Sequence, residues 1–425
     1  MAHTRFIQIH TLTSYPGALL NRDDAGFAKR LPFGGTTRTR VSSQCLKYHW
    51  RNFTGEHALQ ELDAPRSVRS RETFQRKIAK PLIEGGLPGR LVEASTFTLK
   101  ELVTGSKASK NDMKKILNPD DETDPTSMLK TKQITILGYP EIEYLKEMVQ
   151  DRVSSMEQDF EVFWTENEPD ADTISEAIDA ILDITQTELK KNLKGLNLAS
   201  GLDAALFGRM VTSDILARGD GAIHVAHSIT THEEESESDY FSAVDELRRD
   251  EPDESGELGA GHINSQELNS GLYYGYVTVD VPLLVSNLEG VKRTEWTQAD
   301  TTLASNVLRS LIQMITTVSP GAKLGSTAPY SYAQLLLVES GNAQPRTLAN
   351  AFQQAVSMRT NGVLANSFDA LGQYLSQMDS MYGKTTERRL AAMHAPASLT
   401  EAVQVQSTVS VPEIADWVAG QIGAV

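Results

Sequence analysis

Residues 6–12 read Phe-Ile-Gln-Ile-His-Thr-Leu, a run in which apolar and polar side chains alternate. Such alternation with β-branched residues predicts a half-buried strand. A second strand-forming stretch, Ala-Ile-His-Val-Ala-His-Ser-Ile, lies at residues 222–229, and a partner strand is expected at residues 272–281. Residues 55–205 lie between the first and second strand-forming stretches and have a mostly helical pattern. Strands separated by a long helical excursion predict an α+β fold of few strands, and a doubly wound sheet is not expected because the sequence lacks GxGxxG.

The composition is that of a globular protein. Of 425 residues, 40 % are hydrophobic and 23 % are charged, which excludes collagen-like, coiled-coil and globally disordered chains. No apolar run approaches the roughly 18 to 20 residues of a membrane span, and the first residues lack a signal-peptide profile. We therefore expect no membrane association and a cytoplasmic location. The single cysteine, Cys45, excludes an internal disulfide and a cysteine-built zinc site.

The net charge of −16 conceals an asymmetry between two parts of the chain. Residues 1–90 hold 15 Lys and Arg against 7 Asp and Glu, whereas the remaining residues hold 25 against 49. This division favours a basic N-terminal surface that binds a polyanion. The alternative is chance clustering on a solvated surface, which carries mixed charges in any case.

A basic helix is predicted to begin at Ser42 or Ser43, either of which can cap it. Apolar residues at positions 46, 50 and 53 give this helix a buried face. Gln44, Lys47 and Arg51 share a polar stripe beside that face. Together with the free N–H groups of the first turn, this stripe can hold the phosphates of a nucleic-acid strand without reading its bases. An ordinary exposed amphipathic helix is the alternative interpretation.

Two other groups of residues are candidates for a metal or catalytic site. His224 and His227 are expected on opposite faces of a strand because their spacing is odd, so they cannot easily share an ion with His232. Asp23 and Asp24 could form a magnesium-binding pair, but such a turn is more often held by Asx hydrogen bonds. We therefore expect neither a metal nor another cofactor.

Two segments look like insertions. Residues 104–132 are polar and lysine-rich, which predicts an exposed and mobile segment. Residues 233–257 contain twelve carboxylates against two arginines, Arg248 and Arg249. A segment of that composition cannot form a core, so it is expected to project into solvent or onto another subunit.

Several ordered motifs resemble one known family, the CasC backbone subunits of type I-E CRISPR Cascade. The motifs are FIQIH (residues 6–10), LNRDD (20–24), FGG (33–35), RTRVSSQCLK (38–47), GRMVTS (208–213), DGAIHVAHSITTH (220–232), YFSAVDEL (240–247) and PGAK (320–323). They are spread over most of the chain.

The resemblance implies a modified ferredoxin-like palm, similar to an RNA-recognition motif, with a large helical fingers insertion and a thumb hairpin. The expected boundaries are palm at 1–54, 206–231 and 271–425, fingers at 55–205 and an acidic thumb at 232–270. The resemblance also implies a non-enzymatic subunit whose copies polymerise head to tail along one CRISPR RNA, beside other Cascade subunits. The bases are then presented in segments for pairing with target DNA in antiviral defence.

Functional residues are carried over only at matching positions. The guide phosphates would be held by Lys29, Arg40, Ser42, Gln44, Lys47 and Arg51, with Arg38 as a neighbour. Met210 would pack near the kinked nucleotide, and the same motifs add Arg22, Ser43, Arg209 and Lys323 to the expected RNA-binding set. Lys190, Lys191 and Lys194 are candidates for target DNA, although they lie outside a matching motif.

Two other functions remain open at this point. Related backbone subunits of type III effectors cut target RNA with a loop aspartate, so the alternative is a metal-dependent ribonuclease that would use Asp23 or Asp24. A self-assembling protein without nucleic acid is the third possibility.

Overall fold

A computed structural model of the chain describes residues 3–119, 124–165, 168–184, 186–196, 198–210, 215–216, 219–244, 260–405 and 407–422. The chain forms two compact units. The first, here called the sheet unit, comprises Met1–Leu62, Ile223–Val281 and Thr301–Val425. The second, the helical unit, comprises Asp63–Ala222 and Pro282–Asp300. Among the described residues, none of the helices has the length and apolar character that a membrane crossing requires.

The sheet unit is built on a nine-stranded antiparallel sheet, as far as the described residues show. The strand order is β11 (Thr386–Ala392), β10 (Leu335–Gly341), β1 (Phe6–Ala18), β9 (Ala260–Asp280), β7 (Ser228–Thr230), β3 (Thr36–Val41) and β2 (Arg30–Phe33). β6 (Ile223–Val225) and β8 (Ser236–Val244) also pair with β9. The predicted α+β class with a ferredoxin-like antiparallel palm is confirmed.

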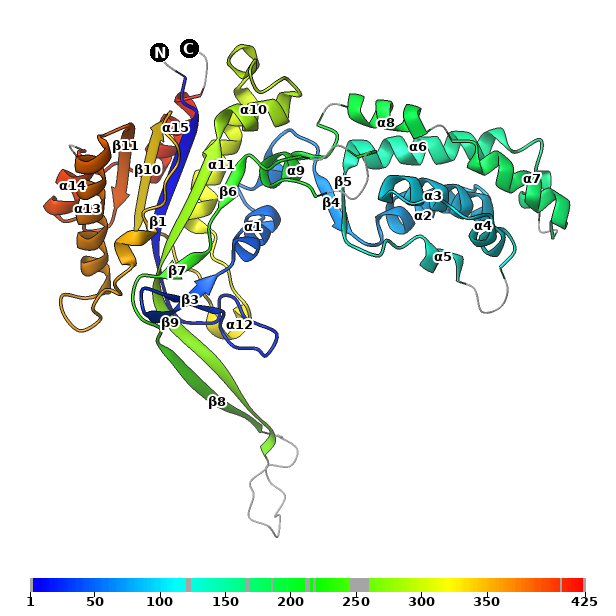
Figure 1. The fold of residues 1–425 in the computed structure, drawn as a ribbon. Coiled ribbons are helices and arrows are strands. Elements are labelled where there is room, and N and C mark those ends of the chain that lie inside the picture. Colours follow the sequence, from blue (N-terminus) through cyan, green and yellow to red (C-terminus); the bar gives the residue numbers. More distant parts are fainter. Residues whose placement is uncertain are drawn as a thin grey trace, which may run out of the picture. The chain divides into compact units, whose positions relative to one another are not determined.

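Helices cover both faces of this sheet (Figure 1). Leu12 of β1 packs with Leu335 and Leu337 against α13 (Val363–Tyr382), α14 (Ala397–Val403) and a 3-10 turn (Ala349–Phe352). Ile9 and its alternate neighbours on β1 face the other way, toward α1 (Ser43–Asn52) and α11 (Thr302–Thr317). α15 (Val411–Gly420) packs on α11. β1 is therefore buried on both faces, because each face packs against a separate helical layer, and the expectation of a half-buried strand is wrong.

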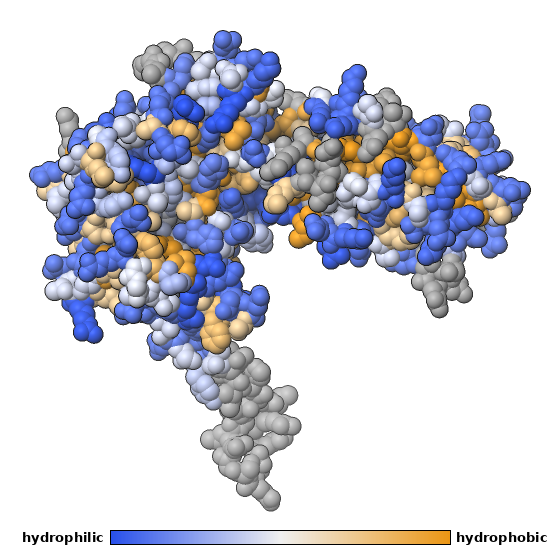
Figure 2. Space-filling model, viewed as in Figure 1, coloured by the Kyte–Doolittle hydropathy of each residue, from blue (hydrophilic) through white to orange (hydrophobic). Residues whose placement is uncertain are grey.

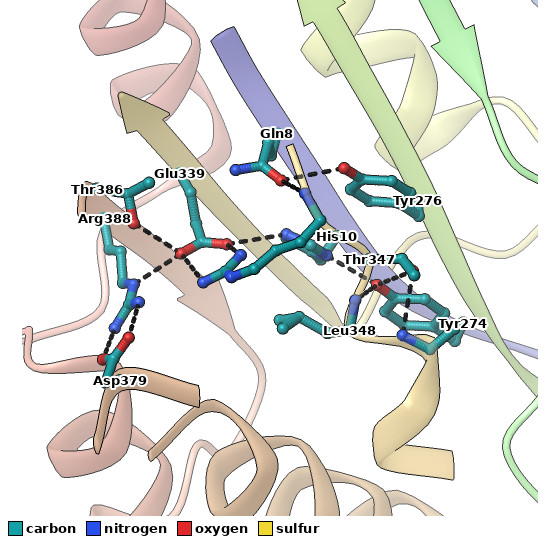
Figure 3. A network of polar contacts seen from close by, with 12 residues as sticks. Gln8, His10, Tyr274, Tyr276, Glu339, Thr347, Leu348, Asp379, Thr386 and Arg388 are labelled. Carbon is teal, nitrogen blue, oxygen red and sulfur yellow. Dashed lines mark hydrogen bonds and ion pairs between the residues drawn. The ribbon is translucent and has the colours of Figure 1, made fainter. Parts of the chain in front are cut away.

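A buried polar network holds one end of the sheet together (Figure 3). His10 Nε2 lies 3.2 Å from Glu339 Oε2, and the Glu339 carboxylate also accepts hydrogen bonds from Arg346 and from Arg388. Arg388 in turn makes two bonds to Asp379 of α13, at 2.5 and 2.6 Å. Burial alone would raise the pKa of Glu339, but the hydrogen bonds from His10 and Arg346 outweigh it and hold the pKa well below its usual range. The network joins β1, β10, β11 and α13, so it has a structural role.

β8 and the first half of β9 form a hairpin that extends away from the rest of the sheet unit (Figure 1). Residues 260–269 of β9 pair with β8, while residues 271–280 pair with β1. The exposed side chains at the start of the hairpin include the acidic residues Glu233, Glu235 and Glu237. Most of the remaining carboxylates of the acidic segment, and both of its arginines, lie outside the described residues.

The helical unit packs around one apolar core that includes Phe74, Leu91, Leu145 and Ile178. Its elements are β4 (Ser67–Ser70), a π-helix (Phe74–Ala79), α2 (Lys80–Glu84), α3 (Gly89–Thr104), α4 (Lys110–Leu117), α5 (Pro125–Met128), β5 (Thr135–Gly138), α6 (Tyr139–Ser155), α7 (Ala171–Leu182), α8 (Gln186–Gly195), α9 (Leu202–Phe207) and α10 (Val281–Glu289). β4 and β5 form a two-stranded sheet.

Two expectations about this unit are wrong. The segment predicted to be exposed contains α4, whose Met113, Ile116 and Leu117 are fully buried in the core because they recur at helical spacing. Residues 206–222 and 282–300 were expected in the palm but belong to the helical unit, whereas residues 55–62 were expected in the fingers but belong to the sheet unit. One reason is that Asn287 Nδ2 donates hydrogen bonds to the carbonyls of Ala205 and Asp220.

Candidate nucleic-acid interface

The loop after β1 is fastened to the start of α1 by Asn21. The side-chain oxygen of Asn21 accepts a hydrogen bond from the Ser42 N–H at 2.9 Å. The backbone carbonyl of Asn21 accepts one from the Lys29 N–H at 2.8 Å. Lys29 in turn accepts a backbone bond from Arg40 at 2.8 Å. Three segments, the loop, the end of β3 and the first turn of α1, are therefore held side by side in the sheet unit.

α1 begins where a serine caps it. The Ser42 hydroxyl accepts a hydrogen bond from Cys45 N at 3.3 Å and is buried, so Ser42 acts through the helix cap and not as an exposed phosphate ligand. Trp50 is buried, whereas Gln44 is exposed and Lys47 and Arg51 are half-buried. The first turn carries no acidic residue. The partial positive charge of the helix N-terminus is therefore not offset locally.

Arg40 is paired with a histidine from a distant segment. Arg40 Nη1 lies 2.8 Å from Nδ1 of His227, which is an exposed residue between β6 and β7. Burial, followed by the charges of Arg40 and Lys29, lowers the pKa of His227. The two cations, Lys29 and Arg40, together with the His227 ring beside them are here called the cationic cluster. A role for His227 beside Arg40 was not expected from the sequence.

Arg38 does not belong to the exposed set. Its guanidinium is fully buried and donates to the carbonyls of Thr230 at 3.0 Å and Phe352 at 2.9 Å. Burial lowers the pKa of Arg38. The expectation that Arg38 contacts phosphate is wrong for this structure, because its guanidinium is buried and donates to the carbonyls of β7 and of the 3-10 turn Ala349–Phe352.

Arg209 is likewise a structural residue, in the helical unit. Its buried side chain donates to Glu141 Oε2 at 2.6 Å, and that oxygen also accepts the Gly138 N–H at 3.0 Å. The next residue, Met210, is 96 % exposed. The expected RNA contact by Arg209 is therefore wrong, while Met210 is displayed on the surface beside a firmly held neighbour.

The remaining expected contacts are spread over other parts of the chain. Arg22 is exposed, Ser43 is half-buried at the start of α1, and Lys323 is exposed with its amine 2.6 Å from the side-chain oxygen of Gln266. In the helical unit, Lys190 is half-buried while Lys191 and Lys194 are exposed on α8.

The aspartate pair is engaged in the loop itself. Asp23 Oδ1 accepts hydrogen bonds from the N–H groups of Ala25 at 3.0 Å and Phe27 at 2.9 Å, as an Asx turn does. Asp24 is exposed. Within the part of the chain that the structure describes, no group of three or more His, Cys, Asp or Glu side chains could hold a metal ion.

Arg30 links the loop to the hairpin, which the sequence did not predict. Its guanidinium forms ion pairs with Glu234, just before β8, and with Glu267 of β9. Glu267 also accepts the Ala28 N–H at 2.8 Å. Arg30 and Glu234 are 204 residues apart, and no local pattern connects them.

Hydrophilic residues cover most of the visible surface of the sheet unit (Figure 2).

Comparisons with known proteins place the chain in a family. No curated protein matches it. A solved structure described as "CRISPR RNA-guided surveillance complex, pre-nicking" contains a chain that is 24 % identical, with a TM-score of 0.72 over 98 % of this chain and 100 % of that one. A second, described as "CRISPR RNA-guided surveillance complex", gives 21 % identity and a TM-score of 0.61 over 98 % and 99 %. These two chains share the fold. A family model described as CT1975-like protein matches residues 7–417, and the chain belongs to this family.

Proposed function

We propose that this protein is a non-catalytic backbone subunit of a type I-E CRISPR Cascade complex that holds guide RNA by its phosphates. The observation that carries the proposal is the meeting of the cationic cluster with the uncompensated N-terminus of α1. The fold that the chain shares with chains of CRISPR surveillance complexes supports it.

The proposed contacts are independent of sequence. Lys29, Arg40, Lys47 and Arg51 offer charge and Gln44 offers an amide, and these groups can all contact phosphate oxygens. Base pairing with the target would then supply specificity. An interface of this kind binds unrelated RNAs with equal affinity and loses affinity as salt rises.

The assembly follows from the same proposal. Copies of the chain would associate head to tail along the guide, in the cytoplasm, with the acidic hairpin of one copy near the basic surface of the next. A repeated heterologous contact builds an open helical filament. Lys191 and Lys194, exposed on α8, remain candidates for target DNA, with the half-buried Lys190 beside them.

Copurified nucleic acid tests the proposal. The full chain, expressed with a CRISPR RNA, should elute with an ultraviolet absorbance ratio typical of a ribonucleoprotein, and ribonuclease treatment should lower that ratio. Two RNAs of unrelated sequence should then bind the stripped protein equally. A protein that carries no RNA and binds neither RNA at low salt would overturn the proposal.

A cleavage assay separates this proposal from the ribonuclease alternative. Asp23 already serves the loop as a hydrogen-bond acceptor, so we expect it to have no part in catalysis. The assembled complex, incubated with complementary RNA and magnesium, should leave that RNA intact. Cleavage that disappears in Asp23→Ala or Asp24→Ala would instead establish the ribonuclease.

A further inference from the structure

The pairing of Arg40 with His227 fixes which ring nitrogen carries the proton. A guanidinium can only donate hydrogen bonds, so the His227 Nδ1 at 2.8 Å from Arg40 Nη1 must accept. The ring is then neutral, with its proton on Nε2. The lowered pKa of His227 agrees with this tautomer, since protonation would place a third charge beside Arg40 and Lys29.

The Nε2–H group is available for an external acceptor. His227 is exposed, and the only hydrogen bond that it makes among the described residues is the one to Arg40. Arg40 also donates through Nε to the Arg30 carbonyl at 3.4 Å, which leaves its Nη2 facing no acceptor in the described part of the chain. Two donors, one neutral and one charged, are thus presented by two adjoining side chains.

Phosphate is the ligand chemistry that suits this pair. A phosphate diester has oxygens that accept from both donors, and the nearby charge of Lys29 adds attraction without needing a direct bond. We propose that His227 is a further phosphate-binding residue, and that Arg40 holds it as a neutral donor. The inference rests on the proposed function, because the phosphate is taken to be that of a bound RNA.

Arg40 has a second effect, on the pH dependence of binding. The charged groups that act on the ring are Arg40 from β3 and Lys29 from the loop. With both present, the pKa of His227 is lowered, first by burial and then by these two charges, so RNA binding should gain less from its protonation as the pH falls than it would in their absence. Without Arg40, the pKa of His227 should return toward its ordinary value of about 6.5. The ring then charges in mildly acidic solution and attracts phosphate more strongly.

Four variants test the inference by fluorescence anisotropy with a labelled RNA. His227→Leu removes the donor, and we expect about tenfold weaker binding, as for the loss of one hydrogen bond to a charged group. His227→Gln keeps a donor near the position of Nε2 and should retain most of the affinity. Arg40→Ala should bind about fivefold more tightly at pH 5.5 than at pH 8 in about 0.1 M salt, the gain from one additional charge on a single strand. Arg40→Ala combined with His227→Gln should lose that gain.

The controls separate the possible failures. His224→Leu, three residues earlier on β6, changes the same residue type and should leave affinity unchanged. If His227 merely positions Arg40, then adding His227→Gln to Arg40→Ala will have no effect at pH 5.5, and Arg40→Ala will bind equally at both pH values; either result overturns the inference. A wild-type protein that binds no RNA would instead overturn the proposed function.

Discussion

Removing two cations from α1 should change the salt dependence of RNA binding in a calculable way. Lys47 and Arg51 follow each other by one helical turn on the stripe beside the buried Trp50. For a single strand, each phosphate contact contributes about 0.7 to the slope of log affinity against log salt. The variant that carries Lys47→Ala and Arg51→Ala should therefore lose about 1.4 from that slope if each residue neutralises one phosphate.

The same slope gives the expected loss of affinity at any salt concentration. The double variant should bind about 25-fold more weakly than wild type in about 0.1 M salt, and only about fivefold more weakly in about 0.3 M. Fluorescence anisotropy with two labelled RNAs of unrelated sequence measures both values. The loss should be equal for the two sequences, because the contacts are to phosphates.

A matched control tests whether the location of the charges matters. Arg359 and Lys384 are exposed and flank α13, which covers the face of the sheet opposite to α1. Changing both to alanine removes the same total charge, and we expect the wild-type slope. If the two double variants showed equal slopes, only the net charge of the protein would matter, and the assignment of α1 as the phosphate-binding helix would be refuted.

Three further predictions concern stability and Met210. Arg38→Ala should lower the free energy of unfolding in urea by about 3 kcal/mol, because it leaves buried carbonyls without a hydrogen-bond donor. Arg40→Ala should lower that free energy by less than about 0.5 kcal/mol. Equal losses in the two variants would contradict the burial of Arg38. Glu339→Gln should cost about 3 to 5 kcal/mol, since buried guanidinium groups lose their counter-charge. Because the folded pKa of Glu339 is lowered, the wild-type protein should also lose this stabilisation as the pH falls below about 4.5, and the variant should lack that loss. Met210→Ala should leave urea unfolding unchanged, because the side chain is exposed, and should alter the signal of a fluorescent base analogue in the guide; no change in that signal would argue against contact with the kinked nucleotide.

The elements that the sequence predicted are those set by local patterns. The alternation in residues 6–12 produces β1, and the serine pair followed by apolar residues at helical spacing produces α1 with Ser42 as its cap. In both cases the information lies within one strand or three helical turns. α4 carried the same kind of signal, but its lysines made the whole segment look solvated, although three of its apolar residues are in the core.

Burial of individual arginines could not be predicted in this way. Arg38 and Arg40 are two residues apart on one strand, yet Arg38 binds carbonyls near residues 230 and 352 while Arg40 meets His227. Arg209 is paired with Glu141, 68 residues earlier in the chain. These partners are brought together only by the completed sheet and the helical core. Neither the charge count nor the motifs therefore indicated that Arg38 and Arg209 are buried.

The continuity of β9 has a mechanical consequence. One uninterrupted strand forms half of the hairpin and then runs between β1 and β7, and at the junction a side chain on Gly271 would meet Thr230. The hairpin is thus a cantilever whose fixed end is the middle of the sheet. A neighbouring molecule that pulls on the hairpin would put the backbone of β9 under tension. The hydrogen bonds between β9 and β1 would then resist the pull in shear, all at the same time and not one after another.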